Sequence, residues 1–220
     1  MAVTQEDLAF MKESLPFWNK ISEEQQKQLT RSTMPHTYAK GQSMDNDSQG
    51  CKGLLLVKSG QIRAYILSEA GKEITLYRLF ERDLCIFSAS CMLKDIHFDI
   101  YMEAERDSSI LMIPTTVYNG LNKNSLAVSN YTSELISSRF TDVMWVMEQV
   151  VFMSFDKRLA NFLLEQSVID GSDTLSITHE TIAKNMGSAR EVVTRMLQYF
   201  QSEGMVTHFR GGVTITDRKK

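Results

Sequence analysis

Three charged residues near the end of the chain have the side-chain chemistry that DNA base recognition requires. Arg190, Glu191 and Arg195 follow one another at steps of one and four residues, so a helix would bring them to one face. An arginine donates in a fork to guanine O6 and N7, and a carboxylate accepts from cytosine N4. The same residues are also compatible with plain solvated charges, including an i,i+4 pair between Glu191 and Arg195. The elements around them must distinguish the two interpretations.

The surrounding residues predict a pair of helices joined by a tight turn. Thr178 is a candidate N-cap, and a short helix over residues 181–186 would end at Gly187, which supplies the turn. A second helix is expected from Ser188 to Gln201, with Thr194 on the same outer face as the three charges. Its other face is apolar at helical spacing: Val192, Val193, Met196, Leu197 and Phe200. Two helices joined in this way form a helix-turn-helix.

The residues after the second helix predict a β-hairpin. Residues 204–216 form two short strand-like runs around Gly211 and Gly212, as expected for strands joined by a glycine turn. A hairpin in this place is the wing of a winged helix-turn-helix. Helix, turn, helix and wing in succession favour DNA recognition over the interpretation as solvated charges.

The charge distribution supports this interpretation although the net charge does not. The chain has a net charge of −3 and a pI near 5.8, whereas DNA phosphates attract a basic surface. From residue 184 onward, however, seven lysines and arginines outnumber three acidic residues. Solvated tails are also commonly basic, so the charge agrees with DNA recognition but does not by itself exclude solvated charges.

The first half of the chain has the character of β-structure that follows two short helices. Thr4 with Asp7, and Ser22 with Gln25, have the spacing of helix-capping pairs. Short apolar or alternating runs then follow at residues 54–57, 62–67, 74–79, 98–102 and 109–113. With turn signals between them, these runs predict an antiparallel β-roll. The expected fold class is therefore α+β, with a jelly-roll-like N-terminal part.

A long helix is expected between the two regions, from about residue 125 to residue 153. Its apolar residues recur mostly at three- and four-residue steps: Val128, Tyr131, Leu135, Val143, Met147 and Val150. Such a helix is either a core helix or a contact between two copies, and its length favours a homodimer through residues 124–153. The chain would then consist of helices and roll (1–123), the long helix (124–153) and a winged helix-turn-helix (154–220).

Composition places the chain among ordinary globular proteins. Its hydrophobic fraction of 43% and charged fraction of 23% exclude disordered and collagen-like classes. The sequence has no apolar run long enough to span a bilayer, and its start lacks the basic region of a signal peptide. Three scattered cysteines do not suit a disulfide framework. We therefore expect a cytoplasmic protein without a membrane partner.

The C-terminal pattern from Ile177 to Ile215, with GSAREVVTR at residues 187–195, resembles the CRP/FNR family of bacterial transcription regulators. Residues 152–160 look like that family's hinge, and the N-terminal half resembles its cyclic-nucleotide-binding-like β-roll. The resemblance implies a homodimer that binds double-stranded DNA at an inverted repeat with TGA-containing half-sites and contacts RNA polymerase. The resemblance implies that the base-reading residues are Arg190, Glu191, Thr194 and Arg195. It implies that the phosphate-binding residues are Thr178, His179 and Ser188.

The chain departs from this family at the effector site. Cyclic-AMP binders carry a Gly-Glu-Leu turn and an Arg-Ser pair, whereas residues 86–90 here are IFSAS and residues 97–99 are HFD. A cyclic phosphate would meet no arginine there, so cyclic AMP is not expected. Three cysteines fall short of the four ligands of an iron-sulfur cluster, and a haem role for His97 has little support. The effector is therefore unknown, and no catalytic or metal site is assigned.

Two cysteines near the expected roll admit two interpretations. Cys85 and Cys91 are either buried small hydrophobic residues, as free cysteines commonly are, or a functional pair that acts as a thiol redox switch or a soft metal site. An effector or redox site at the roll would be built from these two residues together with Phe87, Ser88 and Phe98.

Three classes of function are compatible with a chain of this kind. A DNA-binding regulator controlled through the roll accounts for the polar outer face of the second helix. The alternative is a small-ligand-sensing module with a degenerate DNA-binding domain, which would be expected to lose that face. An enzyme is disfavoured, because no nucleophile has a recognisable base and no cluster of histidines and carboxylates suits a metal.

Overall fold

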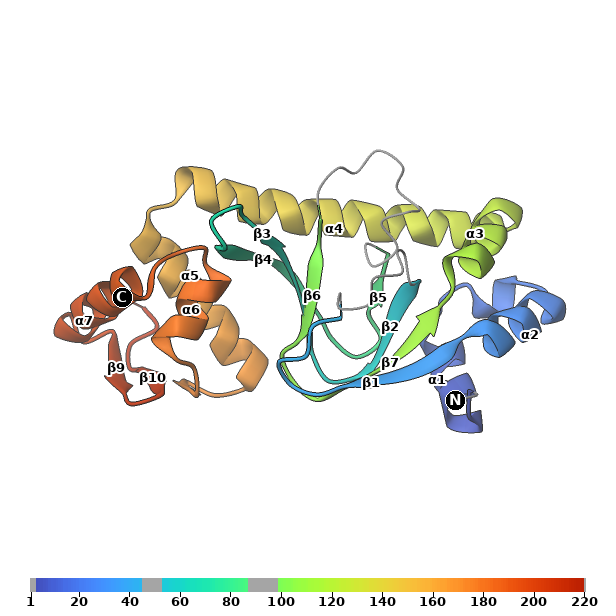
Figure 1. The fold of residues 1–220 in the computed structure, drawn as a ribbon. Coiled ribbons are helices and arrows are strands. Elements are labelled where there is room, and N and C mark those ends of the chain that lie inside the picture. The colour runs from blue at the N-terminus through green and yellow to red at the C-terminus, as the bar shows by residue number, and fades with distance from the viewer. Residues whose placement is uncertain (1–2, 45–52, 87–98, 220) are drawn as a thin grey trace. The chain divides into compact units, whose positions relative to one another are not determined.

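The computed structural model describes residues 3–44, 53–86 and 99–219. The chain divides into two compact units: an N-terminal unit of residues 1–66 and 76–143, and a C-terminal unit of residues 67–75 and 144–220. Figure 1 colours the chain from blue at the N-terminus to red at the C-terminus. Each unit has its own hydrophobic core, and the fold class is the predicted α+β.

The chain opens with α1 (Gln5–Ser14), the 3₁₀ turn η1 (Trp18–Lys20) and α2 (Glu23–Ser32). Both predicted capping pairs are confirmed. Thr4 Oγ1 accepts from the Asp7 N–H at 3.1 Å, and the Asp7 carboxylate accepts from the Thr4 N–H at 2.9 Å. Ser22 and Gln25 make the same reciprocal pair. Such a cap stabilises a helix by about 1 kcal/mol, so local hydrogen bonds define where both helices begin.

Among the described residues, the roll consists of two sheets. One has the order β1-β7-β2-β5, from β1 (Met34–Tyr38), β7 (Ser108–Ile113), β2 (Leu54–Ser59) and β5 (Leu84–Cys85). The other has the order β4-β3-β6, from β4 (Glu73–Leu79), β3 (Ile62–Leu67) and β6 (Tyr101–Ala104). The predicted strands at 54–57, 62–67, 74–79 and 109–113 are confirmed. The predicted run at 98–102 overlaps β6, which begins at Tyr101.

The sequence did not predict β1, which pairs antiparallel with β7 from Met34 opposite Met112 to Tyr38 opposite Ser108. This strand contains Pro35, and its residues are exposed or half-buried. It lies at the edge of its sheet, where a proline is tolerated and where no apolar alternation is needed. The pattern that marks a half-buried strand is therefore missing.

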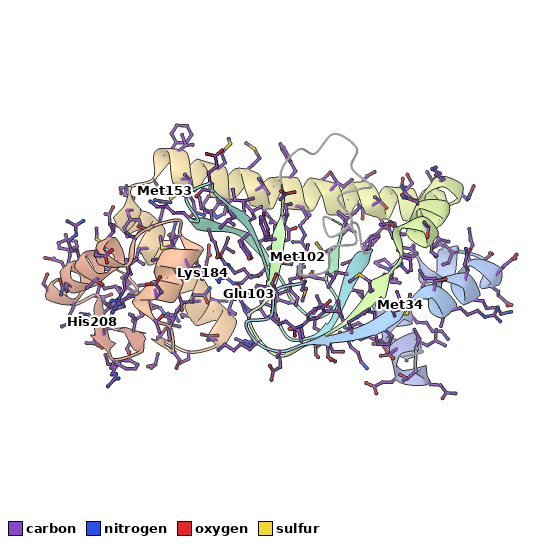
Figure 2. All side chains as sticks on the ribbon, in the orientation of Figure 1. Met34, Met102, Glu103, Met153, Lys184 and His208 are labelled. Atoms are coloured by element: carbon purple, nitrogen blue, oxygen red, sulfur yellow. The ribbon has the colours of Figure 1, made fainter. Side chains whose placement is uncertain are left out.

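The core of the N-terminal unit lies between the first sheet and the helices. Leu54 and Leu56 of β2 and Leu111 and Ile113 of β7 are fully buried there, with apolar residues from α1 and from α3 (Thr115–Asn124). In the second sheet, β6 alternates between half-buried and buried residues. Figure 2 labels two successive residues of β6, Met102, which is buried, and Glu103, which is half-buried. This alternation separates the apolar face of β6 from a polar one.

The long helix α4 runs from Leu126 to Phe152, one residue shorter at each end than predicted. The predicted apolar stripe is divided in two. Val128, Tyr131 and Leu135 pack into the core of the N-terminal unit, whereas Met147 and Val150 are exposed and Val143 is half-buried. An exposed line of side chains instead occupies the C-terminal half of the helix: Phe140, Met144, Met147 and Val151.

The C-terminal unit contains α5 (Phe155–Asp170), β8 (Thr174–Leu175), α6 (His179–Asn185) and α7 (Arg190–Ser202), then β9 (Val206–Phe209) and β10 (Gly212–Ile215). The predicted wing is confirmed as the hairpin of β9 and β10. It gains a third strand, because β8 pairs with β10 in the order β8-β10-β9. Two residues are too few to show a periodicity, so the sequence did not predict β8.

Candidate nucleic-acid interface

The first helix of the predicted motif, α6, is positioned by its cap and by the turn that ends it. Thr178 Oγ1 accepts from the Thr181 N–H at 3.1 Å, which confirms the predicted N-cap. The turn follows at Gly187, whose φ of 64° lies in the left-handed region that favours glycine. The Ser188 N–H donates to the Ala183 carbonyl at 3.0 Å and closes this turn. The predicted cap and turn are therefore confirmed, whereas α6 itself, His179–Asn185, begins two residues before the predicted range of 181–186.

The second helix, α7, begins at Arg190, so the predicted start at Ser188 is wrong by two residues. Its N-cap is Ala189, which is extended at φ −99° and ψ 146°. Because Gly187 is left-handed and Ala189 is extended, the two residues after the glycine belong to the turn. The predicted apolar face is present. Its buried residues are Val193, Leu197 and Phe200, and its half-buried residues are Val192 and Met196.

The three charged residues of the predicted base-reading face lie on the exposed side of α7. Arg190, Glu191 and Arg195 are all exposed, and none of them forms an ion pair with any residue that the structure describes. The pair of Glu191 with Arg195 is accordingly not formed. Side chains without an internal partner keep their hydrogen-bonding capacity for a ligand. This face therefore offers two guanidinium groups and one carboxylate.

Thr194 is half-buried and makes two polar contacts of its own. Its hydroxyl oxygen is 2.9 Å from the Arg190 carbonyl oxygen and 2.9 Å from His179 Nδ1. The first contact lies within α7, and the second joins α7 to the first residue of α6. The side chain therefore contributes to the packing of the two helices.

A second histidine, which the sequence analysis did not single out, completes this group. The rings of His179 and His208 of β9 are 5.7 Å apart and meet edge to face, and Figure 2 shows His208 in the C-terminal unit. Burial, followed by the charges of His208 and Arg190, lowers the pKa of His179. Residues 206 and 208 of the predicted hairpin share a face, but no spacing in the sequence indicates that this face lies beside His179.

The other two predicted phosphate contacts lie at the ends of the same short helix. Thr178 is exposed before the start of α6, and its hydroxyl is also 2.8 Å from Thr181 Oγ1. Ser188 is half-buried in the turn after α6. All seven predicted DNA contacts thus belong to one compact unit, and a direct side-chain contact joins His179 to Thr194.

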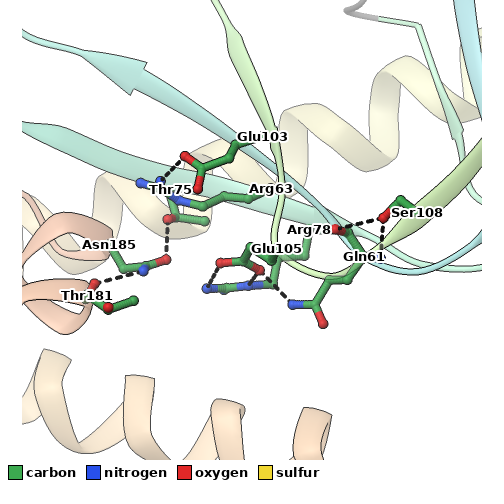
Figure 3. A network of polar contacts seen from close by, with 9 residues as sticks. All are labelled: Gln61, Arg63, Thr75, Arg78, Glu103, Glu105, Ser108, Thr181 and Asn185. Atoms are coloured by element: carbon green, nitrogen blue, oxygen red, sulfur yellow. Dashed lines mark hydrogen bonds and ion pairs between the residues drawn. The ribbon is translucent and has the colours of Figure 1, made fainter. Parts of the chain in front are cut away.

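Segment 67–75 belongs to the same unit and contacts the last residues of α6 (Figure 3). The Thr75 hydroxyl donates to Asn185 Oδ1 at 2.7 Å, and Asn185 Nδ2 donates to the Thr181 carbonyl at 2.9 Å. Lys184 Nζ lies 3.6 Å from a Glu73 carboxylate oxygen. These contacts hold the end of α6 directly before the glycine turn.

The N-terminal unit contains a polar network that the sequence analysis missed (Figure 3). Arg78 Nε donates to Glu105 at 2.7 Å, and Gln61 Nε2 donates to the same carboxylate oxygen at 2.6 Å. Arg63 is only 1% exposed and lies 3.8 Å from the Glu103 carboxylate. The partners lie in or directly beside different strands, so no spacing within a single run indicates them.

Of the predicted effector or redox residues, only Cys85 lies within the described residues, and Cys91, Phe87, Ser88 and Phe98 lie outside them. Cys85 is fully buried, with its Sγ 3.7 Å from the Tyr77 hydroxyl. Burial, followed by the proximity of the thiol, raises the pKa of Tyr77 well above its usual range. The surroundings of Cys85 are those of a packed thiol.

The described residues contain neither a metal-binding cluster nor a membrane-spanning helix. No group of three or more histidine, cysteine, aspartate or glutamate side chains in that part of the chain is arranged to hold a metal ion. The helices in the same ranges include none that could span a bilayer.

Comparison with known proteins identifies the family. A model of the Crp-like helix-turn-helix domain matches residues 157–220. The chain is 50% identical to a regulator of the Crp/Fnr family from Eubacterium rectale of known structure, over 94% of this chain and 96% of that one, with a TM-score of 0.89. It is 27% identical to the regulatory protein HlyX of Actinobacillus pleuropneumoniae over 176 residues, 76% of this chain and 72% of HlyX.

A more distant relative is the cyclic AMP receptor protein of Thermus thermophilus, 25% identical over 166 residues, with 76% of each chain covered. These relatives are transcription regulators and not enzymes. The chain therefore belongs to the CRP/FNR family of transcription regulators and carries that family's helix-turn-helix DNA-binding domain.

Proposed function

We propose that the chain is a homodimeric regulator that binds an inverted repeat with TGA-containing half-sites through α7. The observation that carries this proposal is the free outer face of α7, where Arg190, Glu191 and Arg195 are exposed without an ion partner among the described residues. Arginines suit guanine, and the carboxylate suits cytosine. In a dimer, two copies of α7 would enter successive major grooves about 34 Å apart.

The contact between the two copies would lie on α4. Phe140, Met144, Met147 and Val151 follow one another at steps of four, three and four residues, which is the spacing of a helix seam. All four are exposed, between 38% and 64%. A line of large apolar side chains is stabilised when a partner excludes water from it. A second copy of the same helix covers it symmetrically.

The dimer is tested by placing a charge on this line. Met147→Glu would bury a carboxylate in the seam, so we expect light scattering to show a shift from the mass of a dimer toward the 25.1 kDa of one chain. Ser138→Glu is the control, because Ser138 is exposed on the same helix but off the line. A monomer mass for the unmodified chain at micromolar concentration would contradict the proposal.

Base recognition is tested by selecting binding sites from random duplex DNA with the purified chain. We expect an inverted repeat with TGA-containing half-sites, and we expect Glu191→Ala to relax the preference at one position of each half-site. Glu24→Ala is the control. Glu24 and Glu191 are both exposed acidic residues in the first turn of a helix, Glu24 in α2 and Glu191 in α7. An enriched site that Glu191→Ala leaves unchanged would contradict the assigned role.

Control through the roll is the last part of the proposal, with residues 1–123 as the sensing part, 124–153 as the dimer helix and 154–220 as the DNA-binding part. An effector or a redox change near Cys85 would then alter DNA affinity and contact with RNA polymerase. Affinity that is unaffected by oxidation, by reduction and by Cys85→Ser with Cys91→Ser would remove the thiols from this role. The alternative, a sensing module with a degenerate DNA domain, predicts no salt-dependent binding to any DNA.

A further inference from the structure

The hydrogen bonds of Thr194 determine which nitrogen of His179 carries a hydrogen. Thr194 has one hydroxyl hydrogen, and the Arg190 carbonyl, 2.9 Å away, can only accept it. His179 Nδ1 is 2.9 Å from the same hydroxyl oxygen, so this nitrogen is the donor of the second bond. In the neutral ring the hydrogen therefore resides on Nδ1, and Nε2 presents a bare lone pair.

The surroundings of this ring disfavour its charged form in the free protein. The titratable and charged groups that act on it from the neighbouring elements are His208 of β9 and Arg190 of α7. Burial, followed by the charges of these two groups, lowers the pKa of His179 from its ordinary value of 6.5. Two imidazolium rings with centroids 5.7 Å apart also repel each other. At neutral pH the free ring is accordingly neutral.

A DNA phosphate reverses this preference. Its oxygens accept hydrogen bonds and carry negative charge, so a lone pair on Nε2 repels them, whereas an Nε2–H of an imidazolium donates to them. The negative charge also offsets the repulsion from His208 and Arg190. The ring is thus able to bind a phosphate only after it takes up a proton at Nε2.

We propose that His179 binds a backbone phosphate of DNA as an imidazolium, so that DNA binding takes up a proton from solvent at this site. This site rests on the proposed function, because it adjoins Arg190 on the face assigned to DNA. Thr194 is its positioning residue. It keeps the hydrogen on Nδ1 and leaves Nε2 as the atom that titrates, a role different from the base contact that the family resemblance implies.

The test measures DNA affinity against pH at constant ionic strength, with the full chain and a mixed-sequence duplex of about 30 base pairs. Backbone contacts do not depend on base sequence, so this probe needs no knowledge of the operator. We expect the unmodified chain to bind about tenfold more tightly near pH 6 than near pH 8. Calorimetry in two buffers of different ionisation enthalpy counts the protons that are taken up on binding.

Four variants separate this site from other titrating groups. His179→Gln removes the titration, so its affinity is expected to be nearly the same at both ends of the pH range. His36→Gln is the matched control, since His36 is an exposed histidine on β1, and it should keep the unmodified profile. Thr194→Val removes the acceptor for Nδ1–H and is expected to shift the profile, whereas Thr194→Ser keeps the hydroxyl and should restore it. Circular dichroism verifies that each variant is folded.

The outcomes distinguish this inference from the proposed function. A pH profile that persists in His179→Gln overturns the site, and so does pH-independent binding by the unmodified chain without proton uptake. Either result leaves DNA binding itself in place. An unshifted profile in Thr194→Val overturns the positioning role. A chain that fails to bind the duplex at every pH overturns the proposed function, and the site with it.

Discussion

Two sets of charged side chains, one in each unit, are used in opposite ways. In the N-terminal unit, Arg78 is bonded to Glu105 at 2.7 Å and Arg63 lies buried beside Glu103. In the C-terminal unit, the guanidinium groups and the carboxylate on the outer face of α7 are exposed and have no ion partner within the described ranges. A buried, paired charge is committed to the fold, whereas an exposed, unpaired one is available to a ligand. The contrast supports the proposal that the outer face of α7 is the one that binds a ligand.

The largest expected effect comes from breaking a charge pair in the N-terminal unit. Arg63→Met leaves the Glu103 carboxylate, whose side chain is 18% exposed, without its guanidinium. Removing one partner of a buried pair costs about 3 kcal/mol, and urea unfolding followed by tryptophan fluorescence measures it, since Trp18 is buried in the same unit. The double variant Arg63→Met with Glu103→Leu is the control and should recover most of the loss. An unchanged urea midpoint in the single variant would show that the pair does not contribute to the free energy of unfolding.

The second effect is expected to fall on DNA binding alone. Arg190→Ala removes an exposed guanidinium with no internal ion partner, so the free energy of unfolding should change by less than about 0.5 kcal/mol. The affinity for a selected duplex should fall by about tenfold, because a forked arginine contact contributes roughly 1–3 kcal/mol. Fluorescence anisotropy measures it, and Arg31→Ala on α2 is the control for loss of an exposed arginine. A loss of stability as large as the loss of affinity would remove the contrast between the units.

The same contrast explains which parts of the molecule could be predicted from the sequence. The helix-turn-helix lies within one continuous stretch, and each of its signals is local: a threonine cap at Thr178, a glycine turn at Gly187 and an apolar face on α7. Three errors remained. The first helix begins at His179, directly after its cap, and not at residue 181 as predicted. The start of α7 depended on the conformation of Ser188 and Ala189, which a sequence pattern does not define, and β8 was too short to show a period.

The polar network of the roll could not be predicted for the opposite reason. Arg63 opposes Glu103 in the pairing of β3 with β6, and forty residues separate them along the chain. No spacing within one run indicates such a pair, because it depends on the register between strands. The role of His208 escaped notice for the same reason, since its contact with His179 joins the wing to the first helix of the motif.

A smaller effect compares two threonine caps, one in each unit. Thr4→Ala and Thr178→Ala each remove the side-chain acceptor at the start of a helix, which costs about 1 kcal/mol of stability. Only Thr178 is a predicted phosphate contact, so only its variant should also weaken DNA binding, by a factor of about two to five. Thr178→Ser keeps the hydroxyl and should restore both properties. Equal DNA affinity in Thr4→Ala and Thr178→Ala would indicate that Thr178 is a cap and nothing more.

The smallest effect is the response of each unit to acid in the free protein. Burial alone would raise the pKa of Asp7, but hydrogen bonds from Thr4 and Lys58 outweigh it and lower that pKa. The ionised Asp7 contributes to stability at pH values above 3.8, its pKa in the unfolded chain. This contribution is lost as the pH falls toward the lower pKa of Asp7 in the folded chain. The lowered pKa of His179 acts at higher pH, because below about 6.5 the unfolded chain binds the proton more readily than the folded chain does.

The C-terminal unit should therefore begin to lose stability at a higher pH than the N-terminal unit. Hydrogen exchange, corrected for its intrinsic pH dependence, is expected to show that protection in α6 begins to fall below about pH 6.5, and in α1 only below about pH 4. Asp7→Asn should remove the late loss and His179→Gln the early one, each without altering the other. Because the two titrating groups lie in different units, simultaneous loss of protection in α1 and α6 would mean that the units unfold as one and that their charges do not act separately.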